Sequence, residues 1–159
     1  MKKINYLWII PLSIILIQCQ SNEEDKMDNL KDIAYRFYNE VLNKGGLNLL
    51  PEIMAENFID YNSDSEQQGI EGFKHFLQMV STAFPDLHID INEVLAEGNK
   101  VIARLSISGT QTGNLGTIPP SNKKATWTGI DILEINNNKI TGRWSERNLL
   151  SLMKQIGAI

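Results

Sequence analysis

The pattern of hydrophobic and polar positions changes its period near Pro85. Before this residue, apolar side chains recur every three or four positions, which is typical of helices with one buried face. After it, apolar and polar residues alternate, which indicates strands. The change predicts a domain in which helices come first and a run of strands follows.

Three helices are predicted in the first half of the chain. The first spans residues 28–44, with Asp28 as its cap and glycines at its end, and a short one lies near residues 49–54. The third runs from residue 69 to 84, and Pro85 ends it. We expect the apolar stripes of the first and third helices to pack inward; they consist of Leu30, Ile33, Ala34, Phe37, Tyr38, Val41 and Leu42, and of Ile70, Phe73, Phe76, Leu77, Val80 and Phe84.

The second half predicts an antiparallel meander. After a short strand at "NFIDYN", four strands are expected at residues 86–97, 100–112, 124–136 and 139–147, and a last helix at 148–156. "EGNK" and "NNNK" are turns of the kind that join antiparallel strands. The fold class is therefore α+β, with helices on one face of a curved sheet.

The first nineteen residues, "MKKINYLWIIPLSIILIQC", have a basic start and then an apolar run, which is typical of a signal peptide. The run is short against the roughly 20 residues that cross a bilayer, so a retained membrane anchor is the weaker alternative. We expect the protein to be exported.

Cys19, the only cysteine, directly follows the apolar run. "LIQC" before the polar "QSNEEDK" resembles a bacterial lipoprotein signal, and an incidental thiol is the alternative. The predicted organisation is a signal peptide at 1–18, lipidated Cys19 with a polar tether at 19–27, and one domain at 28–159. The partner would then be a membrane, reached through a lipid anchor, and Gln20 would favour the outer membrane of the cell envelope.

Charge and composition exclude several classes of function. The net charge of −4 becomes −6 when residues 1–18, with Lys2 and Lys3, are removed, and an acidic domain does not suit nucleic acid. The two histidines have no neighbouring ligands at metal-site spacing, and no phosphate loop is present in the sequence. Neither a metal nor another cofactor is implied.

A carboxylate interrupts the apolar strand "WTGIDILEI" at Asp131. Alternation places Trp127, Gly129 and Asp131 on one face, where an acid between apolar walls has the features of a small-molecule pocket. Burial there would raise the pKa of the carboxyl group and suit it to proton transfer. The alternative, of about equal weight, is that Asp131 pairs with an arginine inside the sheet: Arg104, Arg143 or Arg147.

Further candidates surround this strand. The last strand should pair with it, which makes Glu146 a second acid and Arg143 an anion-binding or charge-pairing partner. An exposed strand-end carboxylate is the simpler interpretation of Glu146, and a core position is the simpler interpretation of Trp144. His88 would contact a ligand only if its polar strand face lines a cavity, and an exposed face is simpler.

The stretch from "GIEGFKHFLQMVSTAFPD" through "EGNKVIAR", "GTQTG", "IPPSNKK" and "GIDI" to "NKITGRW" resembles the SnoaL-like polyketide cyclase, or ester cyclase, family of the nuclear transport factor 2-like superfamily. The resemblance covers about residues 30–158. It implies a cone of antiparallel sheet around helices, a pocket at the open end, and a homodimer formed through the sheet. It also implies a cofactor-free aldol closure with an aspartate as acid and base.

Two hypotheses about function follow. The first is a domain that binds a small hydrophobic carbonyl compound and catalyses cyclase-type or isomerase-type acid–base chemistry, with Asp131 as the acid and base. Trp127 would be a wall of the pocket, and Tyr61, Arg143 and Glu146 would be polar groups within it. The family commonly has acids after the last-strand Trp, whereas Ser145 and Asn148 stand there in this chain. The second hypothesis is therefore a non-catalytic binding or interaction module on the same fold, with Asp131 as a structural ion-pair member.

Overall fold

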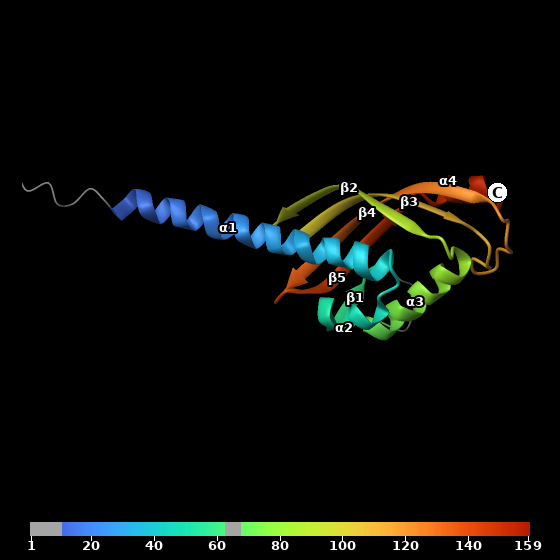
Figure 1. Cartoon of the computed structure of the whole chain (residues 1–159), viewed down its shortest axis with the longest axis horizontal. Coiled ribbons are helices and arrows are strands. Elements are labelled where there is room, and N and C mark those ends of the chain that lie inside the picture. The colour runs from blue at the N-terminus through green and yellow to red at the C-terminus, as the bar shows by residue number, and fades with distance from the viewer. Residues whose placement is uncertain (1–10, 63–67) are drawn as a thin grey trace, which may run out of the picture.

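The computed structural model describes residues 11–62 and 68–159, with side chains from residue 23 onward (Figure 1). Its helices are α1 (Pro11–Arg36), the π-helical η1 (Phe37–Leu42), the 3-10 turn η2 (Leu47–Leu49), α2 (Leu50–Ile53), α3 (Gly69–Ala83) and α4 (Leu149–Ile156). Its strands are β1 (Met54–Asp60), β2 (His88–Glu97), β3 (Lys100–Thr110), β4 (Lys124–Asn136) and β5 (Lys139–Arg147). The predicted α+β order is confirmed.

The first helix differs from its prediction, because α1 begins well before Asp28. Asp28 is not a cap; its carboxylate pairs with Lys31 at 3.1 Å. No glycine or proline occurs between Pro11 and Gly45, so nothing in the sequence stops the helix earlier. The polar stretch expected as a tether is thus helical, and residues 23–26 of it are exposed. Within the described part of the chain, no helix is both long enough and apolar enough to cross a membrane.

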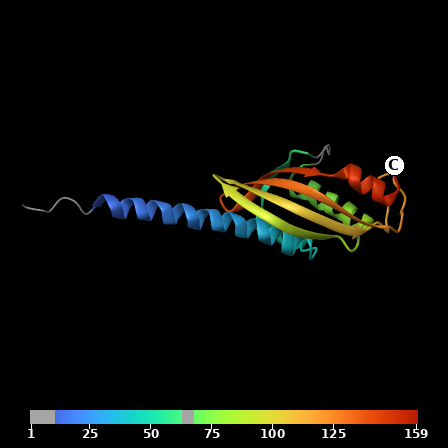
Figure 2. The ribbon, with the colours of Figure 1, turned by 90° about the horizontal axis from the view of Figure 1, so that it is seen from above.

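The five strands form one sheet in the order β1-β5-β4-β3-β2 (Figure 2). All neighbours are antiparallel except β1, which pairs in parallel with β5. The two tight turns are as predicted: Gly98 has a φ of +66°, and Asn137 and Asn138 have φ values of 51° and 59°. Asparagine adopts these left-handed conformations more easily than most residues, which suits a two-residue hairpin.

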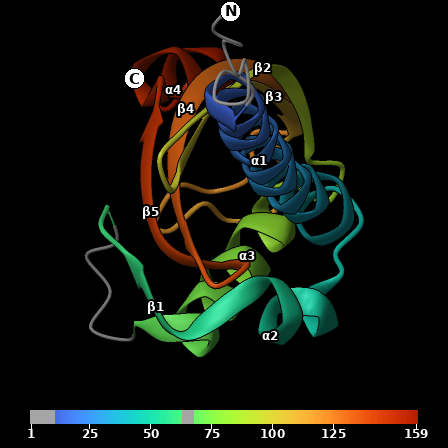
Figure 3. The same ribbon diagram turned by 90° about the vertical axis from the view of Figure 1, so that its left-hand side faces the viewer.

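The sheet curves around the helices, as the end-on view in Figure 3 shows. The described part of α1 packs against β2 and β3, α3 packs against β1, and α4 packs against β4. The core lies between the helices and the concave side of the sheet. The largest fully buried hydrophobic side chains are Phe37, Tyr38, Val41, Leu50, Ile53, Met54, Phe58, Val101, Leu105, Leu133 and Ile140.

A β-bulge near the start of β5 reverses the faces of the residues that follow it. Ile135 pairs with Ile140 and Glu134 pairs with Gly142, so Thr141 is the extra residue. Beyond the bulge, Leu133 faces Arg143, Asp131 faces Ser145 and Gly129 faces Arg147. Arg143, Ser145 and Arg147 therefore point to the same side as Asp131.

The connection between β3 and β4 folds back onto the end of α3. Its backbone donors at Thr112 and Gly113 bind the Ala83 carbonyl oxygen at 3.1 and 3.2 Å. Gln111 is fully buried, and its amide nitrogen donates to the Gly113 and Pro119 carbonyl oxygens at 3.3 and 3.1 Å. These bonds fix a proline-containing loop that could not form a strand ladder.

Candidate ligand-binding site

A cavity of about 290 Å³, which we call the central cavity, opens between α3, the sheet and α4. Fifteen of its eighteen lining residues are apolar, and the three polar ones are Arg143, Ser145 and Arg147 from the end of β5. The apolar lining consists of Leu42, Phe73, Phe76, Leu77, Met79, Val80, Phe84, Leu87, Ile89, Ile107, Leu115, Trp127, Leu149, Leu152 and Met153. An apolar cavity with a few polar groups gathered together is typical of a small-molecule site.

The apolar stripe of α3 lies along one side of the central cavity. The sequence predicted that the stripe shares one face of the helix, and within it Phe73 and Phe84 are buried. Phe76 remains 39% exposed and its neighbour Met79 remains 41% exposed, although both line the cavity. The part of the stripe that lines the cavity is therefore only partly covered by protein.

Asp131 lies behind the polar end of the cavity, with no exposed surface. The Arg147 guanidinium binds it with two hydrogen bonds, from Nη1 to Oδ1 at 2.7 Å and from Nη2 to Oδ2 at 3.1 Å. The hydroxyl of Tyr38, on η1, donates to Oδ2 at 3.0 Å. A buried carboxylate is stable only when it is paired in this way.

Arg143 is the second cation at Asp131 and is also buried. Its Nη1 donates to Asp60 Oδ2 at 3.2 Å, and its Nη2 donates to Ser145 Oγ at 2.8 Å. Its Nε lies 3.6 Å from Asp131 Oδ2, too far for a hydrogen bond, and has no other partner among the described residues. Its guanidinium carbon lies 5.4 Å from the centroid of the Phe73 ring, a cation–π distance.

Gly129 provides the room for Arg147. A Cβ atom at this position would lie 2.6 Å from Arg147 Nη1 and 2.7 Å from Arg147 Cδ. The sequence placed Gly129 on the same face as Asp131, and in the structure the Arg147 side chain fills the space beside this glycine.

These contacts set the ionisation of the site. Burial alone would raise the pKa of Asp131, but the charges of Arg143 and Arg147 and the hydrogen bond from Arg147 outweigh it and lower the pKa. Burial and the charge of Asp131 raise the pKa of Tyr38 well above its usual value, so the phenol stays protonated. The expectation of a raised pKa at Asp131 is wrong, because the paired arrangement is the one present.

The arrangement offers hydrogen-bond donors to a ligand but no base that reaches it. None of the described residues that line the central cavity is an acid or a histidine. The two guanidinium charges are balanced by the carboxylates of Asp60 and Asp131. A neutral acceptor such as a carbonyl oxygen fits this balanced site better than a second anion would.

The residues proposed from sequence divide into two groups. Trp127 and Arg143 line the central cavity. Asp131, Trp144 and Glu146, which were also candidates on these strands, do not line it. The β-bulge turns Trp144 and Glu146 to the opposite face, where Glu146 accepts a bond from the Asn62 amide at 3.1 Å.

Tyr61 and His88 also lie outside the central cavity. Tyr61 is 49% exposed and stacks on Trp144 with ring centroids 4.2 Å apart. His88 is exposed, with its Nε2 at 3.3 Å from Asp90 Oδ1. The simpler interpretation of His88, an exposed strand face, is confirmed, and Tyr61 is excluded from the pocket because it follows β1 onto the outer side.

Tyr38 and Ser145 were missed as site residues, and Arg147 was named as a possible partner of Asp131 but not as a lining residue of the cavity. Tyr38 was assigned only to a helical stripe, although a buried phenol usually requires a partner. Ser145 and Arg147 could have been found as cavity residues only with knowledge of the bulge. Among the described side chains, no three His, Cys, Asp or Glu residues come together as metal ligands.

Comparisons with known proteins agree with this geometry. The family model for SnoaL-like polyketide cyclase matches residues 32–156. TsrD from Streptomyces laurentii is similar with 26% identity and a TM-score of 0.77, over 83% of this chain and 97% of that one. A candidate polyketide cyclase from Bacillus cereus is 34% identical with a TM-score of 0.71, over 82% of each chain. A search of curated proteins found no match.

The fold and the cavity define a class: an α+β cone of the nuclear transport factor 2-like type with an apolar ligand cavity. The match over most of the chain is more specific. The protein belongs to the SnoaL-like polyketide cyclase family.

Replacing Asp131 with Asn should destabilise the fold by about 3–5 kcal/mol, because it leaves the buried guanidinium of Arg143 and the partly buried one of Arg147 short of countercharge. The pH dependence should change as well. Since the folded-state pKa of Asp131 is below the ordinary value of 3.8, its contribution is full above that pH and is lost as the pH falls through the folded-state pKa. We expect wild-type stability to fall more steeply below pH 3.8 than that of Asp131→Asn, by up to about 1.4 kcal/mol per pH unit.

The measurement is the free energy of unfolding in urea at several pH values. Asp90→Asn, which changes an exposed carboxylate on β2, is the matched control and should cost less than about 0.5 kcal/mol. Equal stability of Asp131→Asn and wild type at neutral pH, or parallel curves in acid, would contradict the ion-pair assignment.

Proposed function

We propose that this domain binds a small hydrophobic carbonyl compound in the central cavity. The observation that carries the proposal is the composition of the cavity wall, which is apolar except for the donors Arg143, Ser145 and Arg147 at one end. The apolar body of the ligand would lie against α3 and Trp127, and its oxygen would lie at the end of β5. Half-exposed Phe76 and Met79 would be covered by such a ligand.

The donors at the polar end favour a carbonyl oxygen as the acceptor. Arg143, Ser145 and Arg147 all carry N–H or O–H donors, and hydrogen bonds to charged donors contribute more than those between neutral groups. Because Asp60 and Asp131 already balance the guanidinium charges, the oxygen need carry no charge of its own.

Binding is the function that the geometry supports best, ahead of catalysis. Cyclase-type chemistry by the expected route requires a base that removes a proton beside the carbonyl. Asp131 is a weak base because its pKa is lowered, and Arg147 and Tyr38 occupy its oxygens. The catalytic alternative keeps one favourable feature, since two guanidinium groups at a carbonyl oxygen would stabilise an enolate.

The proposal includes export, with residues 1–18 as a signal peptide and Cys19 as a lipid-bearing residue that anchors the domain in the cell envelope. The basic start and the apolar run before Cys19 support this part. Mass spectrometry of the purified mature protein should find an N-terminal Cys19 carrying acyl chains, and Cys19→Ala should abolish the modification. An unmodified Cys19 in the mature protein would contradict the anchor. The homodimer stays a prediction.

We expect the full chain to bind an unbranched methyl ketone at least about tenfold more tightly than the alkane of equal chain length. The reason is that hydrogen bonds to charged donors contribute about 1.5–3 kcal/mol. Competition against an environment-sensitive fluorescent dye measures both affinities. Met153→Trp, which fills the central cavity from α4, should weaken ketone binding, whereas Leu95→Trp should not, because Leu95 is exposed and lies outside the lining.

Equal affinities for ketone and alkane would exclude the carbonyl-binding end. Unchanged binding in Met153→Trp would exclude the central cavity as the site. Exchange of the ketone's α-hydrogens in deuterated water, dependent on Asp131, would show proton transfer and favour catalysis over binding alone.

A further inference from the structure

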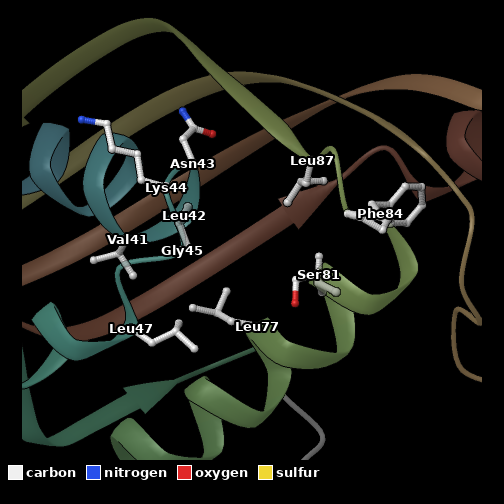
Figure 4. Close-up of a pocket in the computed structure, with 12 residues that line it drawn as sticks. Val41, Leu42, Asn43, Lys44, Gly45, Leu47, Leu77, Ser81, Phe84 and Leu87 are labelled. Carbon is white, nitrogen blue, oxygen red and sulfur yellow. The ribbon is translucent and has the colours of Figure 1, made fainter.

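A second cavity of about 340 Å³, which we call the distal cavity, lies between α3 and the turn that follows η1 (Figure 4). In Figure 4, Leu77 and Ser81 on α3 face Val41 and Leu47 across the opening, and Leu87 lies above Ser81, on the segment that leads from α3 into β2. Asn43 fixes the side of the cavity formed by the turn after η1. Its side chain forms two hydrogen bonds with the backbone of Ile89, of 2.9 and 2.8 Å. The β2 strand therefore holds the η1 turn away from α3.

The distal and central cavities share one apolar wall. Five residues line both of them: Leu42, Leu77, Val80, Phe84 and Leu87. All of these except Phe84 are only half-buried, although they lie next to the core. Apolar side chains with space on both sides lack packing partners, so they can change rotamer at low cost.

We propose that the two cavities form one elongated site, and that the ligand is a long, unbranched apolar compound with its carbonyl oxygen at the end of β5. Its far end would pass between Leu42 and Leu77 into the distal cavity. This inference rests on the proposed function, because it extends the same binding site. It deepens that function by fixing the length and shape of the ligand class.

The volumes support a joint site. Each cavity alone lies near the lower end of the range of about 300–1,000 Å³ that holds small ligands, and together they fall well within it. The guanidinium donors occur only in the lining of the central cavity, whereas Asn43, Lys44 and Ser81 are the polar residues of the distal lining. A compound bound by its oxygen at Arg143 would place its far end against the apolar residues of the distal lining, such as Val41 and Leu47.

The test uses unbranched methyl ketones of increasing chain length, measured by dye competition on the full chain and on Ser81→Trp. Ser81 is exposed and lines only the distal cavity, so the indole should fill that cavity without disturbing the core. In the wild type, affinity should rise by about fourfold per added methylene well beyond the chain length that fills the central cavity. In Ser81→Trp, short ketones should bind as in wild type, and the gain should stop at an earlier chain length.

Gln78→Trp places the same indole elsewhere on α3, outside both linings, and should behave as wild type. Leu47→Trp blocks the distal cavity from the opposite side, so the gain in affinity should again stop at an earlier chain length. The same result from both variants could not be explained by a local distortion of α3 in Ser81→Trp. Identical chain-length profiles in wild type, Ser81→Trp and Leu47→Trp would overturn the elongated site and leave the central cavity intact. Failure of every ketone to bind the wild type would instead overturn the proposed function and this inference with it.

Discussion

The buried ion pair between Asp131 and the arginines of β5 is the interaction on which the rest of the structure depends. It joins four elements of the fold. Asp131 belongs to β4, its two cations belong to β5, the Tyr38 hydroxyl comes from η1, and Asp60 extends the network to β1. Asp131 and Arg143 are buried, so the removal of one leaves the other short of compensation in a low-dielectric interior.

The same network determines what the cavity can do. Because Asp131 and Asp60 take up the positive charge, the arginines present donors to the cavity without a large net charge. Because Arg147 and Tyr38 occupy the Asp131 oxygens, the carboxylate is kept from acting as a base toward a ligand. The site therefore combines an apolar body with a donor-rich end, which suits recognition of a carbonyl oxygen. Membership of the SnoaL-like family fixes the fold but not the reaction, because the reaction depends on the particular side chains at the site.

Much of the fold could be predicted from periodicity. The alternation in "WTGIDILEI" placed Trp127, Asp131 and Leu133 on one shared face, and all three are buried. The tight turns at Gly98 and at Asn137 and Asn138 were predicted from turn chemistry, which acts locally. The prediction that the first helix starts at Asp28 was wrong, because a cap residue is a weak signal when no glycine or proline directly precedes it.

The site was harder to predict, since it depends on two features that strict alternation does not contain. The bulge at Thr141 exchanges the faces of β5, so that Arg143, Ser145 and Arg147 point inward and Trp144 and Glu146 point outward. The direction of the pKa shift at Asp131 depends on two opposing effects: burial raises the pKa, and the two arginines lower it. Only the three-dimensional distances decide which effect is larger. The sequence could therefore name both outcomes for Asp131 but could not choose one.

The most direct test of this account is a carboxyl NMR titration of Asp131 in the folded protein, with Asp131→Asn used to assign the signal. We predict a pKa below the ordinary value of 3.8, because the guanidinium groups of Arg143 and Arg147 stabilise the ionised form more than burial opposes it. A pKa above that value would contradict the account. It would mean that the carboxyl group is desolvated rather than paired, and that Asp131 is suited to proton transfer.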